Sequence, residues 1–406
     1  MTIIFVFGGQ NNEGYQKPHI PQLLEEFDPE RRERAHLYRR KSRRYGLILW
    51  MFSALLGLCV LLTRITIHIQ DWIMEGISSD SFIVVATFFS LAYIVISVWD
   101  LPVSFYLHIQ LGRNFGLSKL TNRQWVLRYL KRSGIGYVIS IIAVEVFYWI
   151  LRNYPDAWWI GTALVSLLFT VVLTNLAPIL LLPRFYKFKP LGDDYPTLAE
   201  ELIDMVTQEG VKTTDAYTWN LGATSTTGNA ALLGLGNTRR IIIADTMLKQ
   251  YTPQEIKWIL LHELAHFKNK DLWKGILIGS FTTLLLFFLT AQIFPSLALL
   301  FGYSTDIDNI GNIPILGLSF SFISLLLFNI PRSWYSRRRE QAADNFATNL
   351  FPDFRTIRSL FIKLADQNLT DINPPWWETL LFASHPPVQK RIQEARKLIK
   401  LTAINI

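Results

Sequence analysis

Long apolar runs alternate with polar segments along the chain, and they predict six membrane-spanning helices. Each run is close to the roughly 20 apolar residues that a helix needs to cross a bilayer. Pro178 lies in the fourth run and is expected to kink it, and the second run can continue to Ile109. The pattern predicts a mainly α fold, a polytopic membrane helical bundle. The predicted spans are 45–63, 82–99, 134–151, 158–182, 275–301 and 309–330.

Between the fourth and fifth apolar runs, the pattern changes to that of a small soluble-type α+β unit. Residues 195–207 have the period of an amphipathic helix. A second helix is expected to begin at residues 252–255, a capping box with proline at the first helical position. Short runs of strand-forming residues predict three strands, at 216–220, 229–233 and 239–244, with a turn at Gly236-Asn237 joining the last two.

The N-terminal tail is polar and ends in a basic stretch, RRERAHLYRRKSRR, with a helix start expected at Asp28-Pro29. This juxtamembrane helix is predicted either to lie on anionic lipid headgroups or to present a solvated charged face that only sets orientation. The patterns together divide the chain into five units. They are a cytoplasmic tail (1–44), a four-span membrane domain (45–183), a catalytic unit (184–272), a two-span membrane hairpin (273–330) and a C-terminal cytoplasmic segment (331–406).

Composition supports a membrane protein rather than two or three soluble domains. Half of the residues are hydrophobic and the mean hydropathy is +0.24. The single cysteine, Cys59, excludes an intrachain disulfide framework and a cysteine zinc cluster. The formal charge of +8 is concentrated beside the apolar runs. This placement indicates membrane topology, with the lipid bilayer as a partner, and argues against nucleic-acid binding.

The residues that carry chemistry are concentrated in one stretch, WILLHELAHFKNKD, from Trp258 to Asp271. His262 and His266 are four residues apart, so on a helix they share one face and can bind the same metal ion. Glu263 projects beside that face, where it can act on water at the metal. The alternative is a buried amphipathic helix with two satisfied histidines. A strand beside such a zinc helix can hold an extended peptide, or it can be an ordinary hairpin.

A catalytic zinc site needs three protein ligands and an open position. No later histidine follows at the short metzincin spacing, so the third ligand is expected to be a carboxylate farther along the chain. Glu340 in REQAADNFA is the best candidate, and Asp344, one turn later, can accept the proton of a ligand histidine's second nitrogen. The alternative is a solvated acidic face that balances the arginines at 337–339.

Basic residues predict which side of the membrane each loop occupies. If the tail before Tyr45 is cytoplasmic, the loops on that side hold most of the lysines and arginines, and the opposite loops hold little more than Arg64 and Arg152. The motif helix and the segment after Ile330 are then both cytoplasmic and can meet. The expected location is the plasma membrane of a prokaryote or the endoplasmic reticulum of a eukaryote.

Several stretches of the chain resemble the type I CAAX prenyl endopeptidases, membrane-embedded zinc proteases of the gluzincin clan. HELAHFKNKD resembles their first zinc motif and EQAADNFA their second. DLPVSFYLHIQLGRNFGLSKLTNRQW resembles their N-terminal membrane domain, and STTGNAALLGLGNTRRIIIADTML the segment before the first motif. SHPPVQKRI resembles their C-terminal motif. The likeness extends over about residues 80–395, and it implies a membrane bundle with a small α+β gluzincin-type protease unit on the cytoplasmic side.

The resemblance implies a role for each residue of the motifs. It implies a Zn²⁺ ion held by His262, His266 and Glu340. Glu263 would be the general base, and Asp344 would orient a ligand from the second layer.

Outside the zinc motifs, the resemblance implies contacts with the substrate. Asn229 and Ala230 would touch the substrate backbone on an edge strand. His385 and Arg391 would stabilise the oxyanion or support Glu340. The substrate would be a peptide or protein, with or without a prenyl group.

The predicted activity is zinc-assisted peptide hydrolysis, in which Glu263 takes a proton from the attacking water and gives it to the leaving amine. Two substrate classes remain, lipidated C-termini and misfolded membrane proteins in quality control. A non-catalytic membrane scaffold held together by zinc is a third possibility. Glu263 argues against it, because a structural zinc site needs no general base. A transporter is a fourth, prompted by Glu145 inside the third span. An acid there usually faces a bundle interior or water, and we expect Glu145 to pair with a polar group on another helix.

Overall fold

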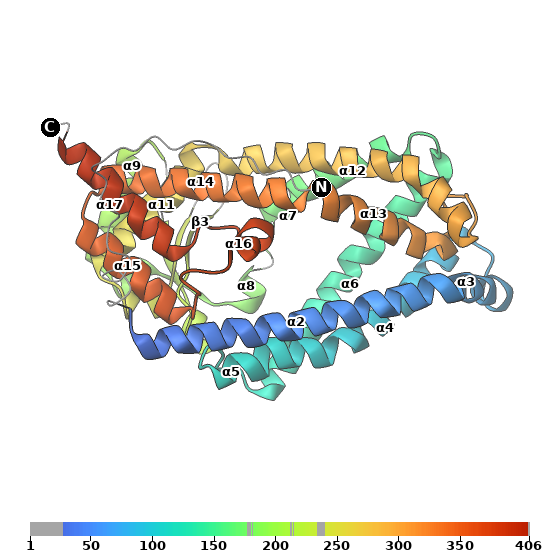
Figure 1. Cartoon of the computed structure of the whole chain (residues 1–406), viewed down its shortest axis with the longest axis horizontal. Coiled ribbons are helices and arrows are strands. Elements are labelled where there is room, and N and C mark those ends of the chain that lie inside the picture. Colours follow the sequence, from blue (N-terminus) through green and yellow to red (C-terminus); the bar gives the residue numbers. More distant parts are fainter. Residues whose placement is uncertain are drawn as a thin grey trace, which may run out of the picture.

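The computed structural model describes residues 27–176, 180, 182–211, 213, 215–233 and 240–404. Pro178 and the predicted Gly236-Asn237 turn lie outside these residues. Figure 1 shows two regions, a compact unit that contains α11, α15 and α17, and long helices that extend away from it. The fold is a mainly helical bundle with a small α+β unit, as predicted. We call the α+β part the protease unit, after its predicted role.

The N-terminal region consists of long helices whose starts are capped by polar side chains. Asp28 accepts hydrogen bonds from the first turn of α2, which confirms the predicted helix start. Thr121 and Gln124 form a capping box at the start of α6. The basic stretch and the first span are one continuous helix. The helices are α2 (Pro29–Thr63), α3 (Ile65–Gly76), α4 (Ser81–Phe105) with its π-helical continuation η1 (Tyr106–Leu111), α5 (Gly112–Asn114), α6 (Asn122–Asn153), α7 (Trp158–Leu176) and α8 (Leu182–Phe185).

Five helices of the described residues are long and apolar enough to cross a membrane, or six if one bent pair counts as a span. The predicted sixth span, 309–330, covers the first part of this bent pair, in which η6 (Ile310–Asn312) and α13 (Ile313–Leu327) meet α14 (Asn329–Leu350) at 47°. The fifth span is α12 (Asp271–Phe301). The short helix α3 was not predicted. Its residues include charges at Asp71 and Glu75, which interrupt the apolar pattern.

The protease unit contains a four-stranded sheet in the order β1-β2-β4-β3. β2 and β4 are parallel, and the other pairs are antiparallel. The three predicted strands are present within a residue of their predicted bounds, and β3 lies at the edge. The elements of this half are β1 (Phe188–Pro190), η3 (Leu191–Asp193), α9 (Pro196–Gln208), β2 (Asp215–Trp219), η4 (Leu221–Ala223), β3 (Ala230–Leu233), β4 (Arg240–Ala244), α10 (Asp245–Leu248) and α11 (Pro253–Lys268).

A single apolar core joins this sheet to the C-terminal helices. Trp258 of α11 is fully buried and meets Phe361 edge to face, with ring centroids 5.3 Å apart. Leu264 and Ala347 are also fully buried in the core, so α11 and α14 pack directly against each other. The two predicted zinc motifs therefore face each other. The C-terminal helices are α14, α15 (Phe354–Gln367), α16 (Trp376–Phe382) and α17 (Val388–Ile404).

The loop that follows α5 attaches the membrane helices to the protease unit. Ser118 and Ser225 form an antiparallel bridge, and the backbone N–H of Lys119 donates to the carbonyl of Thr224 at 2.9 Å. This clasp lies just before β3. The N-terminal helices therefore contact the protease unit beside its edge strand.

Candidate metal centre

Three side chains from two helices converge at the centre of the protease unit. α11 carries His262 and His266 one turn apart, and their Nε2 atoms are 3.2 Å from each other. α14 adds Glu340, whose Oε2 is 3.3 Å from Nε2 of His262 and whose Oε1 is 3.4 Å from Nε2 of His266. One ligand atom from each residue lies within 4.8 Å of the others. This is the spacing of a first coordination shell.

The second nitrogen of each histidine is held by an aspartate. Nδ1 of His262 lies 2.9 Å from Asp344, and Nδ1 of His266 lies 2.8 Å from Asp271. When each Nδ1–H donates to its carboxylate, both Nε2 lone pairs point into the same gap. The Glu340 carboxylate faces the same gap, so two imidazole nitrogens and one carboxylate oxygen are available to a single ion. The donor set therefore fits a metal ion.

Each of these aspartates is paired with an arginine whose side chain is largely but not fully buried. Arg391 donates from Nε and Nη2 to Asp344, at 2.7 and 2.6 Å. Arg339 contacts the Asp271 carboxylate at 2.6 Å and donates to its backbone carbonyl at 2.7 Å. Burial lowers the pKa of Arg391, but the Asp344 carboxylate outweighs it and holds the pKa above its usual range. Arg391 therefore supports Asp344 and does not contact Glu340 directly.

The charged surroundings also shift the proton affinity of His262. Burial lowers the pKa of this imidazole, but its hydrogen bonds to Asp344 and Glu340 outweigh burial and raise the pKa to about 9. A chain without metal therefore holds a proton here at neutral pH. Because a ligand imidazole must be neutral, metal binding releases that proton.

Glu263 is half-buried beside the two histidines. Burial raises its pKa, and the neighbouring His262 and His266 offset only part of this effect. A carboxylate with a raised pKa is a stronger base than one in free solution. This property suits a group that takes a proton from water near neutral pH.

His385 approaches the centre from the segment between α16 and α17. Its Nε2 lies 3.2 Å from Oε2 of Glu340, and its Nδ1 lies 2.8 Å from the hydroxyl of Ser384. Burial lowers the pKa of His385, although Glu340 opposes this. The imidazole thus reaches the edge of the site, where a ring N–H can donate a hydrogen bond.

The edge strand β3 packs against α11. Asn229 lies exposed immediately before it and its carbonyl accepts from the N–H of Ala244 at 2.9 Å, while Ala230 pairs with Ile243. One side of β3 is thus paired with β4. In the described sheet the other side of β3 has no partner strand, which leaves main-chain groups open beside the motif helix.

Comparison with known proteins divides the chain into the same two regions. A family model described as "CAAX prenyl protease N-terminal, five membrane helices" matches residues 11–187, and one for peptidase family M48 matches residues 194–399. The chain belongs to peptidase family M48. It is therefore an integral, multi-pass membrane metalloprotease that hydrolyses a peptide or protein substrate and uses a metal cofactor.

Relatives of this M48 peptidase come from bacteria and eukaryotes. CAAX prenyl protease 1 of Saccharomyces cerevisiae is 27% identical over 72% of this chain and 68% of its own length. The human CAAX prenyl protease 1 homolog is 24% identical over 94% and 89%, and the uncharacterized metalloprotease YhfN of Bacillus subtilis is 23% identical over 83% and 79%. The crystal structure of S. mikatae Ste24p shares the fold, with a TM-score of 0.82, 21% identity and coverage of 92% and 90%.

All of the predicted site residues of the M48 peptidase lie in or beside this centre or at the start of the edge strand next to it. Two residues that contact it were not predicted, Asp271 and Arg339. Asp271 is the last residue of the HELAHFKNKD motif, and its place five residues after His266 was the available signal. Arg339 precedes Glu340 and was interpreted only as part of a basic run. The roles of all these residues in catalysis remain predictions.

Glu145 differs from the site residues, since the expected polar partner on another helix is not found. Both of its carboxylate oxygens are buried, and no described residue forms a hydrogen bond with them.

Proposed function

We propose that the cofactor of this peptidase is Zn²⁺, held by His262, His266 and Glu340. The observation that carries the proposal is the convergence of two Nε2 atoms and one carboxylate, with each histidine oriented by an aspartate–arginine pair. Two histidines and a glutamate are the ligand set of zinc hydrolases that keep a fourth position open. When bound, zinc would polarise the scissile carbonyl and acidify the attacking water.

The side chains around the ion have different roles in the proposed reaction. The Glu263 carboxylate takes a proton from the attacking water and passes it to the amine that leaves. Asp344 and Asp271 hold the ligand imidazoles in the tautomer whose Nε2 lone pair faces the ion. His385 donates a hydrogen bond at the edge of the site, where negative charge develops on the carbonyl oxygen.

The substrate would bind as an extended strand along β3. Asn229 and Ala230 lie at its start and offer main-chain groups next to α11, so a peptide can add to the sheet edge there. We further propose that the centre lies on the cytoplasmic side, because the loops predicted there carry most of the lysines and arginines. We also propose the division into five units that the sequence predicts, with the tail (1–44), the catalytic unit (184–272) and the C-terminal segment (331–406) on this cytoplasmic side.

The test of the proposed chemistry is Glu263→Gln in the detergent-purified chain. Zinc content, measured by atomic absorption, should stay near that of the wild type because Glu263 is not a ligand. Peptide cleavage should fall to background. A matched control is Glu201→Gln, which removes an exposed carboxylate that pairs with Lys257. Wild-type cleavage by the Glu263→Gln variant would disprove the assigned base.

Relatives named CAAX prenyl protease favour a prenylated C-terminal peptide as the substrate. Clearance of misfolded membrane proteins is the second candidate, since β3 can bind any extended chain through its backbone. The two are separated by cleavage of a farnesylated peptide and of its unlipidated twin. A prenyl protease should prefer the first, and a quality-control protease should cleave both at similar rates.

A further inference from the structure

The segment that carries His385 is held from two sides. In Figure 1 the short helix α16 lies between α14 and α2. On the α14 side, Arg337 donates to the carbonyls of Thr379 and Ala383 at 2.6 and 3.0 Å. Ser336 donates to the carbonyl of Ser384 at 2.9 Å, one residue before His385. Thus α14, which carries Glu340 one turn later, satisfies the open carbonyl groups at the end of α16.

On the α2 side, one buried carboxylate receives two guanidinium groups. Glu378 of α16 is 3% exposed. Arg39 contacts its Oε1 through Nε and Nη2, and Arg43 donates to its Oε2 at 3.2 Å. Arg43 also lies over the ring of Trp377, 5.5 Å from the centroid. A carboxylate this buried needs such partners, since an unpaired buried charge is strongly unfavourable.

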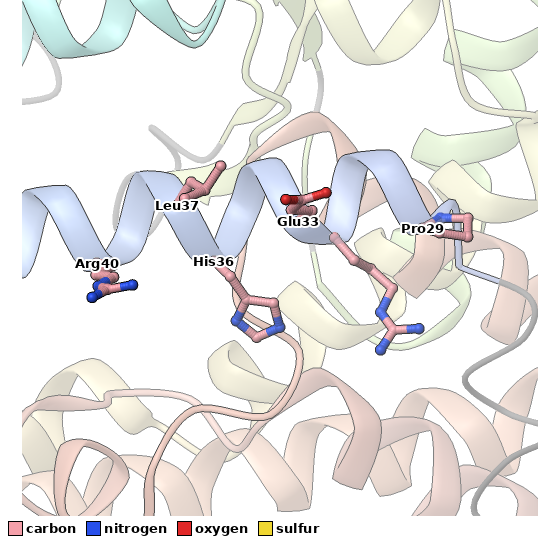
Figure 2. Close-up of a pocket in the computed structure, with 6 residues that line it drawn as sticks. Pro29, Glu33, His36, Leu37 and Arg40 are labelled. Atoms are coloured by element: carbon pink, nitrogen blue, oxygen red, sulfur yellow. The ribbon is translucent and has the colours of Figure 1, made fainter.

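The same face of α2 makes a second contact with the C-terminal segment. His36 lies 3.3 Å from Asp371, and His36, Arg39 and Arg43 share one face of the helix. Figure 2 shows His36 and Arg40 projecting toward the C-terminal ribbons, whereas Leu37 lies on the opposite side of α2. Part of the basic stretch therefore forms ion pairs with the C-terminal segment.

We propose that Glu378 is a positioning residue for catalysis, and that its ion pair with Arg39 and Arg43 places His385 beside Glu340. We call this ion pair the α2–α16 latch. Residues 383–387 form no helix or strand, so the position of His385 depends on how the ends of that segment are anchored. One end is α16, which the latch and Arg337 hold. This inference rests on the proposed function of His385.

The first experiment measures steady-state cleavage by Glu378→Gln, which keeps the shape of the side chain and removes its charge. We expect kcat to fall roughly ten- to a hundredfold, the cost of a small displacement of a catalytic group. KM and zinc content should change little, because Glu378 contacts neither the substrate strand nor the metal ligands. The matched control is Asp194→Asn, which removes an exposed ion pair with Lys189 and should leave both constants unchanged.

A double-mutant cycle tests whether Glu378 acts through His385. In the His385→Ala background, Glu378→Gln should lower kcat no further, because the group that it positions is already absent. In the Arg39→Gln/Arg43→Gln background, Glu378→Gln should likewise cause no further fall in kcat. Equal losses from Glu378→Gln with and without His385 would overturn the proposal, as would a Glu378→Gln variant with wild-type kcat.

Hydrogen exchange provides a readout that does not depend on activity. Amides of residues 376–385 should exchange faster in Glu378→Gln than in the wild type, while those of α11 stay protected. Unchanged exchange in 376–385 would contradict the latch even if no substrate were cleaved. If Glu378→Gln did not fold, Arg43→Gln would remove one exposed partner and give the same result in weaker form. If the wild-type protein itself cleaved no peptide, this would instead count against the proposed function.

Discussion

The protease unit and the membrane helices bury their side chains very differently. In each helix that can cross a membrane, only 6 to 17% of the most apolar 18-residue stretch is buried inside the protein. Phe281 of α12, for example, is 68% exposed. In α11, Leu264 and Ala265 are completely buried. The protease unit is thus closed by its own contacts, as in a soluble domain, whereas the long helices expose apolar faces that suit a lipid environment.

Charged groups show a further difference. Around the metal centre the histidines, aspartates and arginines pair with groups of opposite charge, although Oε2 of Glu340 is buried without a hydrogen bond among the described residues. In the membrane helices, the hydroxyl of Thr290 and both oxygens of Glu145 are buried without a hydrogen-bond partner among the described residues. A connected polar network fixes one geometry. We therefore expect catalytic side chains in a fixed geometry within the protease unit and not among the membrane spans.

The largest expected effect comes from opening the metal centre itself. On the proposed ligand set, Glu340→Ala removes one of three zinc ligands, so the purified variant should lose its metal. Cleavage should fall by several orders of magnitude, since enzymes exceed uncatalysed rates by at least about 10⁶-fold. Zinc content and cleavage are measured together, with Gln341→Ala on the exposed face of α14 as the control. Retention of zinc in Glu340→Ala would mean that another residue is the third ligand.

Removing an aspartate that orients a proposed ligand histidine should lower the metal affinity less than removing a ligand. Asp344→Asn removes the charge that faces both His262 and the buried Arg391. Zinc affinity should fall about 10- to 100-fold, and the unpaired arginine should cost about 3–5 kcal/mol of unfolding free energy. Chelator competition and chemical denaturation measure the two. An affinity equal to that of the wild type would show that Asp344 does not orient His262.

The local parts of this network could be predicted from the sequence, and the long-range parts could not. The helical spacing of His262 and His266 and the alternation of the strands are properties of short segments. Asp271 lies only five residues after His266, so its contact was within reach of the sequence, whereas the contact of Arg339 depends on how α14 packs beside the start of α12. The pair of Arg39 and Glu378 joins residues 339 positions apart, and nothing in either local pattern connects them. β1 has only three residues, too few for a period to be visible.

A matched pair of substitutions tests the difference in packing. Leu264→Ala leaves a cavity in the fully buried core of the protease unit and should cost about 2–5 kcal/mol. Phe281→Ala removes a larger side chain, but one that is 68% exposed, so the change should stay within about 0.5 kcal/mol. Both are compared by thermal unfolding in the same detergent. Similar losses would show that α12 packs against protein over the face that carries Phe281.

The smallest expected effect is a pH-dependent one in the protease unit. Glu255 of α11 is 2% exposed and binds Lys363 and Ser359 of α15, at 2.8 and 2.7 Å. Burial raises the pKa of Glu255, but the bonds to Lys363, Ser359 and the N–H of Thr252 outweigh burial and lower it. A carboxyl whose folded pKa lies below its unfolded value of about 4.3 stabilises the fold above that pH. That stability is lost as the pH falls through the folded pKa.

Glu255→Gln should therefore lower the unfolding free energy by roughly 1 kcal/mol at pH 7, and the difference should shrink below about pH 4. Denaturant unfolding at a series of pH values measures it. Glu201→Gln is the control, because its pair with Lys257 is exposed and should contribute little at any pH. A difference that stayed constant into the acidic range would mean that the charge of Glu255 does not stabilise the junction of α11 and α15. Packing alone would then hold α11, the helix of His262 and His266, in place.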